Sequence, residues 1–218
     1  MRFVDLSHTI EHGMETYPGL PAPIIGDHLS RTDSAAHYDP GTTFQIGRIE
    51  LVANTGTYVD APFHRYQDGG DLADLDLASL AHLPAMVCRA ADGQRALGPE
   101  LFERREVAGC AVLVRTGWDR RWRTPAYFEG HPYLTRAAAE LLRDRGAALV
   151  GIDSLNIDDT GDGARPVHTV LLGAGIPVVE HLRGLDALPD EGFRFFAVPA
   201  KLRGVGSFPV RAFGLLDS

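Results

Sequence analysis

The stretch NTGTYVDAPFH, residues 54–64, concentrates side chains that can do chemistry. It carries a carboxylate at Asp60 and an imidazole at His64, with a proline stiffening the chain between them. Because side chains of an extended segment alternate between two faces, Asn54 and Tyr58 share the parity of these two residues. The spacing suits a metal ligand and an acid–base group in one cleft. A strand edge with a capping aspartate and a surface histidine is the alternative.

Two further polar groups stand in the second half of the chain. His168 and Glu180 flank the apolar run TVLLGAGIPVV, where an unpaired imidazole or carboxylate is costly to bury. Together with Asp60 and His64 they offer a mixed set of nitrogen and oxygen donors, which suits a divalent metal such as Zn or Mn. Their spacing in the sequence leaves open whether the four side chains converge.

Composition limits the classes of protein to which the chain can belong. Its 218 residues suit one large domain or at most two small ones, and a hydrophobic content of 44% is enough for a buried core. A net charge of −8 argues against nucleic acid or a membrane surface as the main partner. The sequence has no run of 18 apolar residues, and its first residues, MRFVDLSHTIEHG, lack the apolar centre of a signal peptide. We therefore expect a cytoplasmic protein with a small-molecule substrate.

The elements that must position these residues follow an α/β pattern. Thr135 is a candidate N-cap for a helix that Gly146 closes, and the apolar run after it predicts a strand. With the apolar strand before it, this makes a βαβ unit and therefore a partly parallel sheet. Residues 11–43 have no sustained periodicity, which is typical of a long functional loop. Strands are predicted at 2–7, 44–53, 84–91, 110–117, 148–153, 176–182, 193–200 and 211–216, and short helices at 98–106 and 167–173.

Motifs along nearly the whole chain carry a resemblance to a known family. NTGTYVDAPFH resembles the H-x-G-T-H-x-D-x-P-x-H signature of the cyclase family, which includes bacterial kynurenine formamidase and isatin hydrolase. FVDLSHTI and TYPGLP resemble the family's opening, VLVRTGW and LVGIDSLNID its central strands, and VHTVLLGAGIPVVEHL the segment with its late metal ligands. The resemblance implies a swivelling β/β/α fold with a mixed sheet, one domain over residues 1–218, and assembly as a homodimer or homotetramer.

The resemblance also implies roles for the polar residues. Family members hold one ion with the signature's first two histidines, which fall at Asn54 and Tyr58 in this chain. The ligands that remain are Asp60, His168 and Glu180, which implies a mononuclear site with one Zn or Mn ion per chain. His64 matches the catalytic acid–base residue.

Substrate contacts are implied at both ends of the motif region. Tyr17, Pro18 and Gly19 resemble the family's substrate-lining segment, although an ordinary Pro-Gly turn is the other interpretation. Asn54 and Tyr58 are candidates for hydrogen-bond donors to a developing oxyanion, or for packing behind the ion.

The activity implied is hydrolysis of C–N bonds other than peptide bonds, in a small amide, formamide or cyclic imide, as in an arylformamidase. The alternative, favoured by Asn54 and Tyr58, is an altered relative that binds a small molecule or works without metal.

Overall fold

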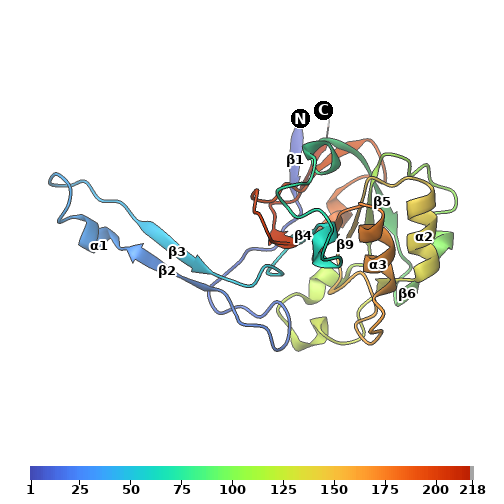
Figure 1. Ribbon diagram of the computed structural model, residues 1–218, viewed down its shortest axis with the longest axis horizontal. Helices are drawn as coiled ribbons and strands as arrows, with labels where there is room; N and C mark the ends of the chain where they lie inside the picture. The colour runs from blue at the N-terminus through green and yellow to red at the C-terminus, as the bar shows by residue number, and fades with distance from the viewer. Residues whose placement is uncertain (217–218) are drawn as a thin grey trace.

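The computed structural model describes residues 1–216, and its central element is a mixed nine-stranded sheet (Figure 1). Its strand order is β1-β13-β11-β5-β7-β9-β10-β4-β12, and β5, β7, β9 and β10 run parallel to one another. The α/β class and the mixed sheet expected from the sequence are confirmed. The strands are β1 (Arg2–Asp5), β4 (Tyr58–Asp60), β5 (Leu83–Arg89), β7 (Ala111–Arg115), β9 (Leu149–Ile152), β10 (Val178–Glu180), β11 (Phe193–Phe196), β12 (Ser207–Pro209) and β13 (Phe213–Leu216).

Two helices cover one face of this sheet. Helix α2 (Arg136–Asp144) begins where the sequence predicts, because the Thr135 hydroxyl accepts a hydrogen bond from the Ala138 N–H. Helix α3 (Pro166–Gly173) follows β9 and packs against α2. The parallel strands of the sheet are apolar at nearly every position, as expected of strands that are buried on both faces. None of the helices in residues 1–216 is long and apolar enough to cross a membrane.

Each face of the sheet has its own apolar core. On the helix side, Val112, Val150 and Val178 pack beneath α2 and α3. On the opposite side, Leu113 and Val179 pack against side chains from the curled ends of the sheet. The alternation of strand residues between the two cores fixes which side chains can meet the helices.

Short elements complete the body. The helix expected at 98–106 is reduced to a single 3-10 turn. The 3-10 turns are η1 (Pro62–His64), η2 (Leu77–Ser79), η3 (Pro99–Leu101), η4 (Trp118–Arg121), η5 (Pro125–Tyr127) and η6 (Leu185–Ala187), and β6 (Ala96–Leu97) pairs with β8 (Tyr133–Leu134).

A two-stranded arm projects far from this body (Figure 1). It consists of β2 (Ile24–Leu29), the short helix α1 (Arg31–Ser34) and β3 (Ile46–Glu50). Most of it lies in the segment expected to be an irregular loop, so that expectation is corrected for β2 and α1. The loop interpretation failed because the arm has no apolar face turned to the core, and therefore no simple periodicity. Ile24, Ile25, Tyr38, Phe44, Ile46 and Ile49 are all exposed apolar side chains of the arm.

Glycine 206 sets how closely β12 approaches the turn that carries His64. A Cβ at Gly206 would lie 2.4 Å from the His64 backbone nitrogen and 2.6 Å from its Cα. The Ala61 N–H also donates to the Gly206 carbonyl at 2.7 Å, so this approach is part of the sheet edge.

Substitution Gly206→Ala should therefore destabilise the protein by about 1–3 kcal/mol, because backbone atoms rather than a flexible side chain must move. Gly163→Ala is the matched control, since a Cβ there meets no atom within 4 Å. Urea unfolding of both variants measures the difference. Equal stability of the two variants would contradict the close approach.

Candidate active site

The register of three strands brings the polar residues of the motif onto the helix side of the sheet. Strand β4 lies between β10 and β12, so that Asp60 is opposite both Val178 and Ser207, while Tyr58 is opposite Glu180. Directly opposed residues of neighbouring strands project to the same face. Because Val178 belongs to the core under the helices, Asp60, Tyr58 and Glu180 point toward α3.

Helix α3 supplies the imidazole that meets these carboxylates. Asp158 covers the first turn of the helix, accepting hydrogen bonds from the backbone N–H groups of Val167 at 2.7 Å and His168 at 3.0 Å. Its Oδ2 also lies 2.6 Å from Nδ1 of His168. Since an ionised carboxylate can only accept, the Nδ1 proton points to Asp158, and Nε2 faces Asp60 and Glu180. Asp158 therefore caps α3 and orients His168.

Two buried polar atoms in this cluster have no hydrogen-bond partner. They are Oδ2 of Asp60 and Nε2 of His168, which lie 3.6 Å apart. Leaving such groups unpaired in the interior is costly. Two ligands of a tetrahedral ion, each 2.0–2.1 Å from it, are about 3.4 Å apart. The donor set therefore fits one divalent cation between them.

A third donor for such an ion is available on either side. Oε1 of Glu180 lies 3.6 Å from Nε2 of His168. On the other side, ligand atoms of Asp60, His64 and His168 all lie within 4.8 Å of one another.

Glu180 is held by three donors from two segments, strand β4 and the chain after β9. The Ile157 N–H donates to its Oε1 at 2.6 Å, and Nδ2 of Asn156 donates to its Oε2 at 3.3 Å. The Tyr58 hydroxyl donates to the same Oε2. Burial raises the pKa of Glu180 to about 7, and the charge of Asp60 adds to this rise, while His168 opposes it.

Tyr58 acts as a neutral donor in this arrangement. Burial, and next the charge of Glu180, raise its pKa well above the ordinary value of 10, so the phenol keeps its proton. A protonated phenol is a poor metal ligand but a good hydrogen-bond donor to a carboxylate. At the motif position where the resemblance implies a metal-binding histidine, Tyr58 instead supports Glu180.

His168 responds strongly to its surroundings in the protein without an ion. Burial lowers its pKa, but the hydrogen bond to Asp158 and the nearby carboxylates of Asp60 and Glu180 outweigh burial and raise the pKa to about 10. The imidazolium then partly offsets the charge of the neighbouring carboxylates.

His64 is fixed to Asp60 through a serine that sequence reasoning did not single out. The Ser207 hydroxyl donates to Oδ1 of Asp60 and lies 2.9 Å from Nδ1 of His64. Because that hydroxyl proton is used on the carboxylate, Nδ1 of the neutral imidazole must donate to Ser207, which leaves the Nε2 lone pair free. His64 is one-third exposed and borders the cavity, so it is accessible to a substrate or water. The role of Ser207 becomes visible only from the pairing of β12 with β4, because Ser207 lies 147 positions after Asp60 in the sequence.

A cavity of about 360 Å³ opens over this cluster. Six residues singled out from the sequence line it or its floor, namely Tyr17, Asn54, Tyr58, His64, His168 and Glu180. Asp60 lies beneath them, in contact with His64 and His168. Leu20, Arg65, Asn156 and Arg165 also line the cavity and were not anticipated, since nothing in their local sequence marks them.

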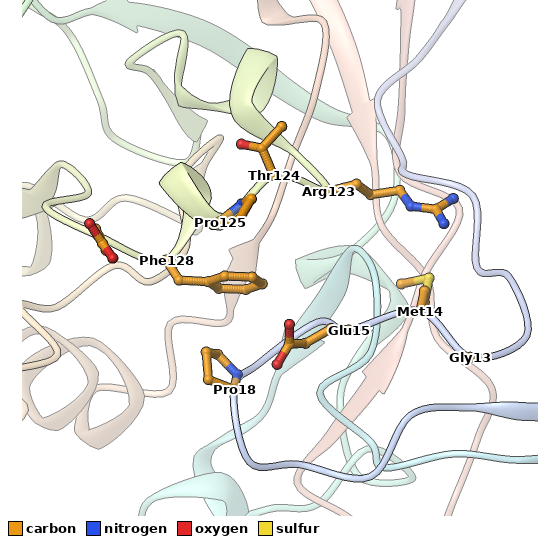
Figure 2. A pocket seen from close by; sticks show the side chains of 9 residues that line it. Gly13, Met14, Glu15, Pro18, Arg123, Thr124, Pro125 and Phe128 are labelled. Atoms are coloured by element: carbon orange, nitrogen blue, oxygen red, sulfur yellow. The ribbon is translucent and has the colours of Figure 1, made fainter.

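The remaining two residues of the expected substrate segment lie elsewhere. Pro18 lines a separate hollow of about 460 Å³ together with Met14, Arg123 and Phe128 (Figure 2). Gly19 lines neither hollow and adopts φ +85°, as a turn glycine does. Of this segment, Tyr17 alone reaches the active-site cavity.

Comparisons with known proteins agree with this architecture. The family described as "putative cyclase" matches residues 4–159. The chain is 26% identical to a kynurenine formamidase of Bacillus cereus over 211 residues, covering 96% of this chain and 95% of that protein. It is 27% identical to a kynurenine formamidase of Geobacillus thermodenitrificans, with the same coverage.

Solved structures of similar fold cover the whole chain. Isatin hydrolase A from Labrenzia aggregata superposes with a TM-score of 0.85 at 23% identity, covering 100% of this chain and 94% of that one. A structure described as a potential metal-dependent hydrolase with cyclase activity gives a TM-score of 0.82 at 24% identity, covering 100% of this chain and 98% of that one.

The contact between Asp158 and His168 provides a test of the candidate metal site. Asp158→Asn should weaken zinc binding by about 10- to 100-fold, because the amide cannot hold His168 in the same tautomer and orientation. Asp159→Asn is the matched control, since the Asp159 carboxylate contacts Arg95 and the Gly161 N–H. Competition with a chromophoric chelator measures both affinities. Equal loss of affinity in the two variants would rule out the orienting role.

Proposed function

Because this chain belongs to the cyclase family, we propose that it is a metal-dependent hydrolase of a small amide, formamide or cyclic imide. Such an enzyme cleaves C–N bonds other than peptide bonds. The kynurenine formamidases among its relatives support the reaction class, and their identity of about 26% leaves the substrate as part of the proposal. The observation that carries the proposal is the pair of unpartnered buried atoms, Oδ2 of Asp60 and Nε2 of His168, below a cavity bordered by His64.

Asp60, His168 and Glu180 are the residues that would hold the ion. Two oxygen donors and an imidazole suit Zn or Mn, and the donors are sufficient for one ion per chain. When bound, such an ion supplies Lewis acidity toward a carbonyl oxygen and makes water more acidic.

His64 is the acid–base residue of the proposed reaction. Its Nε2 accepts a proton from the attacking water and returns a proton to the leaving nitrogen. Ser207 keeps the ring oriented, because its hydroxyl oxygen accepts a hydrogen bond from the Nδ1–H of His64 and its own proton is donated to Asp60. The negative charge of Asp60 stabilises the imidazolium that forms when Nε2 is protonated.

Tyr17 and Asn54 form the walls against which the substrate lies. The Tyr17 hydroxyl donates to the Leu155 carbonyl at 2.6 Å and accepts from Nδ2 of Asn156 at 2.7 Å. These bonds fix the phenol ring in the wall of the cavity. Tyr58 positions Glu180 through its hydroxyl hydrogen bond, and in this proposal it does not contact the oxyanion.

Replacing His64 separates proton transfer from metal binding. We expect His64→Gln to lower kcat by about 100- to 10,000-fold on a formamide substrate, while the protein retains about one ion per chain. Asp60→Asn should lose both the ion and the activity. Metal content by mass spectrometry and steady-state kinetics measure the two effects, and His28→Gln, on the exposed arm, is the control.

Two outcomes would contradict this assignment. Loss of the ion from His64→Gln would show that His64 is a metal ligand. His64 lies close enough to Asp60 and His168 to share an ion with them. Full activity of metal-free wild type would favour the second candidate, a metal-free enzyme. The high pKa of His168 supports that candidate, because an imidazolium at this place supplies positive charge without an ion.

We also propose that the chain assembles with further copies of itself through the arm. A lone two-stranded ribbon is marginally stable in water, so its exposed apolar side chains call for a covering surface. The aromatic pair Tyr38 and Phe44 stands at the tip, with ring centroids 4.9 Å apart. The hollow of Figure 2, with apolar walls at Met14 and Phe128, lies beside the base of the arm. A two-fold pairing of arms would place each tip near the base of the other copy.

The arm variant Ile49→Asp should shift the protein from dimer or tetramer to monomer, because it places a charge in the apolar surface of the ribbon. Ile49 is 63% exposed, and Leu77→Asp is the matched control at a body residue that is 64% exposed. Light scattering coupled to size-exclusion chromatography gives the masses. A monomeric wild type would overturn the assembly.

A further inference from the structure

We propose that Arg65 and Arg165 form an anion subsite at the mouth of the active-site cavity, which binds a carboxylate carried by the substrate. Both guanidinium-bearing side chains line the cavity that contains His64 and His168. The inference rests on the proposed hydrolase function and narrows its substrate class to small amides with an anionic group.

The backbone around Arg165 places its side chain at the cavity. Arg165 immediately precedes α3 with φ +45°, a region that residues other than glycine rarely adopt. Its N–H donates to the Asp162 carbonyl at 3.2 Å, and its guanidinium donates to the Asp159 carbonyl at 3.1 Å. The half-buried side chain is therefore held at both ends rather than extended into solvent.

Arg65 is tied to the same turn of α3. It follows η1, and its Nε donates to the Thr169 hydroxyl at 3.2 Å. The Thr169 N–H in turn donates to the Arg165 carbonyl at 3.0 Å. One turn of helix thus links the two arginines and keeps both at the same rim.

The positive charge of this pair has no internal counterpart. Within residues 1–216, neither guanidinium has a carboxylate within 4 Å, whereas Arg115 and Arg203 each pair with two acids. A guanidinium has five donors in a planar fork that matches a carboxylate. The donors that Arg65 and Arg165 do not use on Thr169 and Asp159 remain for a ligand.

Charge around the cavity explains why such a subsite is needed for an anionic substrate. The chain has a net charge of −8, and the cavity floor holds the carboxylates of Asp60 and Glu180. The acidic balance of the chain disfavours the approach of an anion, and a local cluster of cations offsets that repulsion. Two cations at the rim reverse the field there and fix which end of the substrate enters first.

The size of the cavity limits the ligand. About 360 Å³ corresponds to roughly a dozen water volumes, enough for one ring with an amide and a carboxylate. The reactive amide lies at the histidines on the floor and the carboxylate at the arginines, so the two groups belong to one small molecule.

The test compares two probes that differ only in charge, 2-formamidobenzoate and its neutral isostere 2-formamidobenzamide. The measured quantity is the ratio of kcat/KM for the anion to that for the neutral amide. We expect Arg165→Gln and Arg65→Gln each to lower this ratio by about 10- to 100-fold, the loss typical of a charged hydrogen bond. Arg95→Gln, which pairs with Asp159 but does not line the cavity, is the matched control and should keep the wild-type ratio.

Raising the salt concentration should lower the ratio in the wild type more than in the variants, since screening acts on the charge of the subsite. Arg165→Lys should recover part of the preference, because it restores the charge without the planar fork. Unchanged ratios in both glutamine variants would overturn the subsite.

A binding measurement separates this inference from the proposed reaction. 2-Aminobenzoate is fluorescent, and its titration into the holoprotein needs no turnover. Binding about 10-fold or more tighter to the wild type than to Arg165→Gln supports the subsite even if neither probe is hydrolysed, which would count against the proposed hydrolase alone. Equal binding to both proteins would refute the subsite even in an active hydrolase.

Discussion

The burial of three carboxylates around one imidazole is the constraint on which the site depends. Asp60, Asp158 and Glu180 are at most 1% exposed, and charges removed from water must be compensated within the protein. Asp158 receives the first N–H groups of α3, and Glu180 receives donors from Tyr58 and the chain after β9. Oδ2 of Asp60 has no such partner. The negative charge that remains unbalanced at Asp60 favours a cation at His168, which is either a metal ion or the imidazolium itself.

The departure at Tyr58 follows from the same balance. A phenol opposite Glu180 supplies one more hydrogen bond to that carboxylate, whereas a histidine there would be available to bind metal. Tyr58 thereby supports the carboxylate of Glu180, a candidate metal ligand. It also makes the support of Glu180 part of the strand pairing between β4 and β10.

The fold around the site is shared with proteins of low sequence identity. A TM-score of 0.85 at 23% identity indicates that the sheet, the two helices and their order persist while most side chains differ. The core tolerates such change because apolar packing is satisfied by many combinations of similar volume. Charged groups at the cavity rim are not interchangeable in this way, because their charge and shape select the ligand. Arg65 and Arg165 therefore say more about this chain's ligand than the fold does.

The sequence by itself determined the parallel strands, the α2 N-cap at Thr135 and the residues most worth attention. Hydrophobic runs and capping residues act locally, so their signal lies within a few positions. The family resemblance added the assignment of Asp60, His168 and Glu180 to one ion.

Only the tertiary structure decided that these three residues meet His64 at one cavity, and that Ser207 joins His64 to Asp60. The direction of Nε2 in His168 likewise depends on Asp158, whose position is set by the start of α3. The contacts of Asp60 with His168 and with Ser207 join segments more than a hundred residues apart. They depend on register and side-chain direction, which no local pattern in the chain specifies.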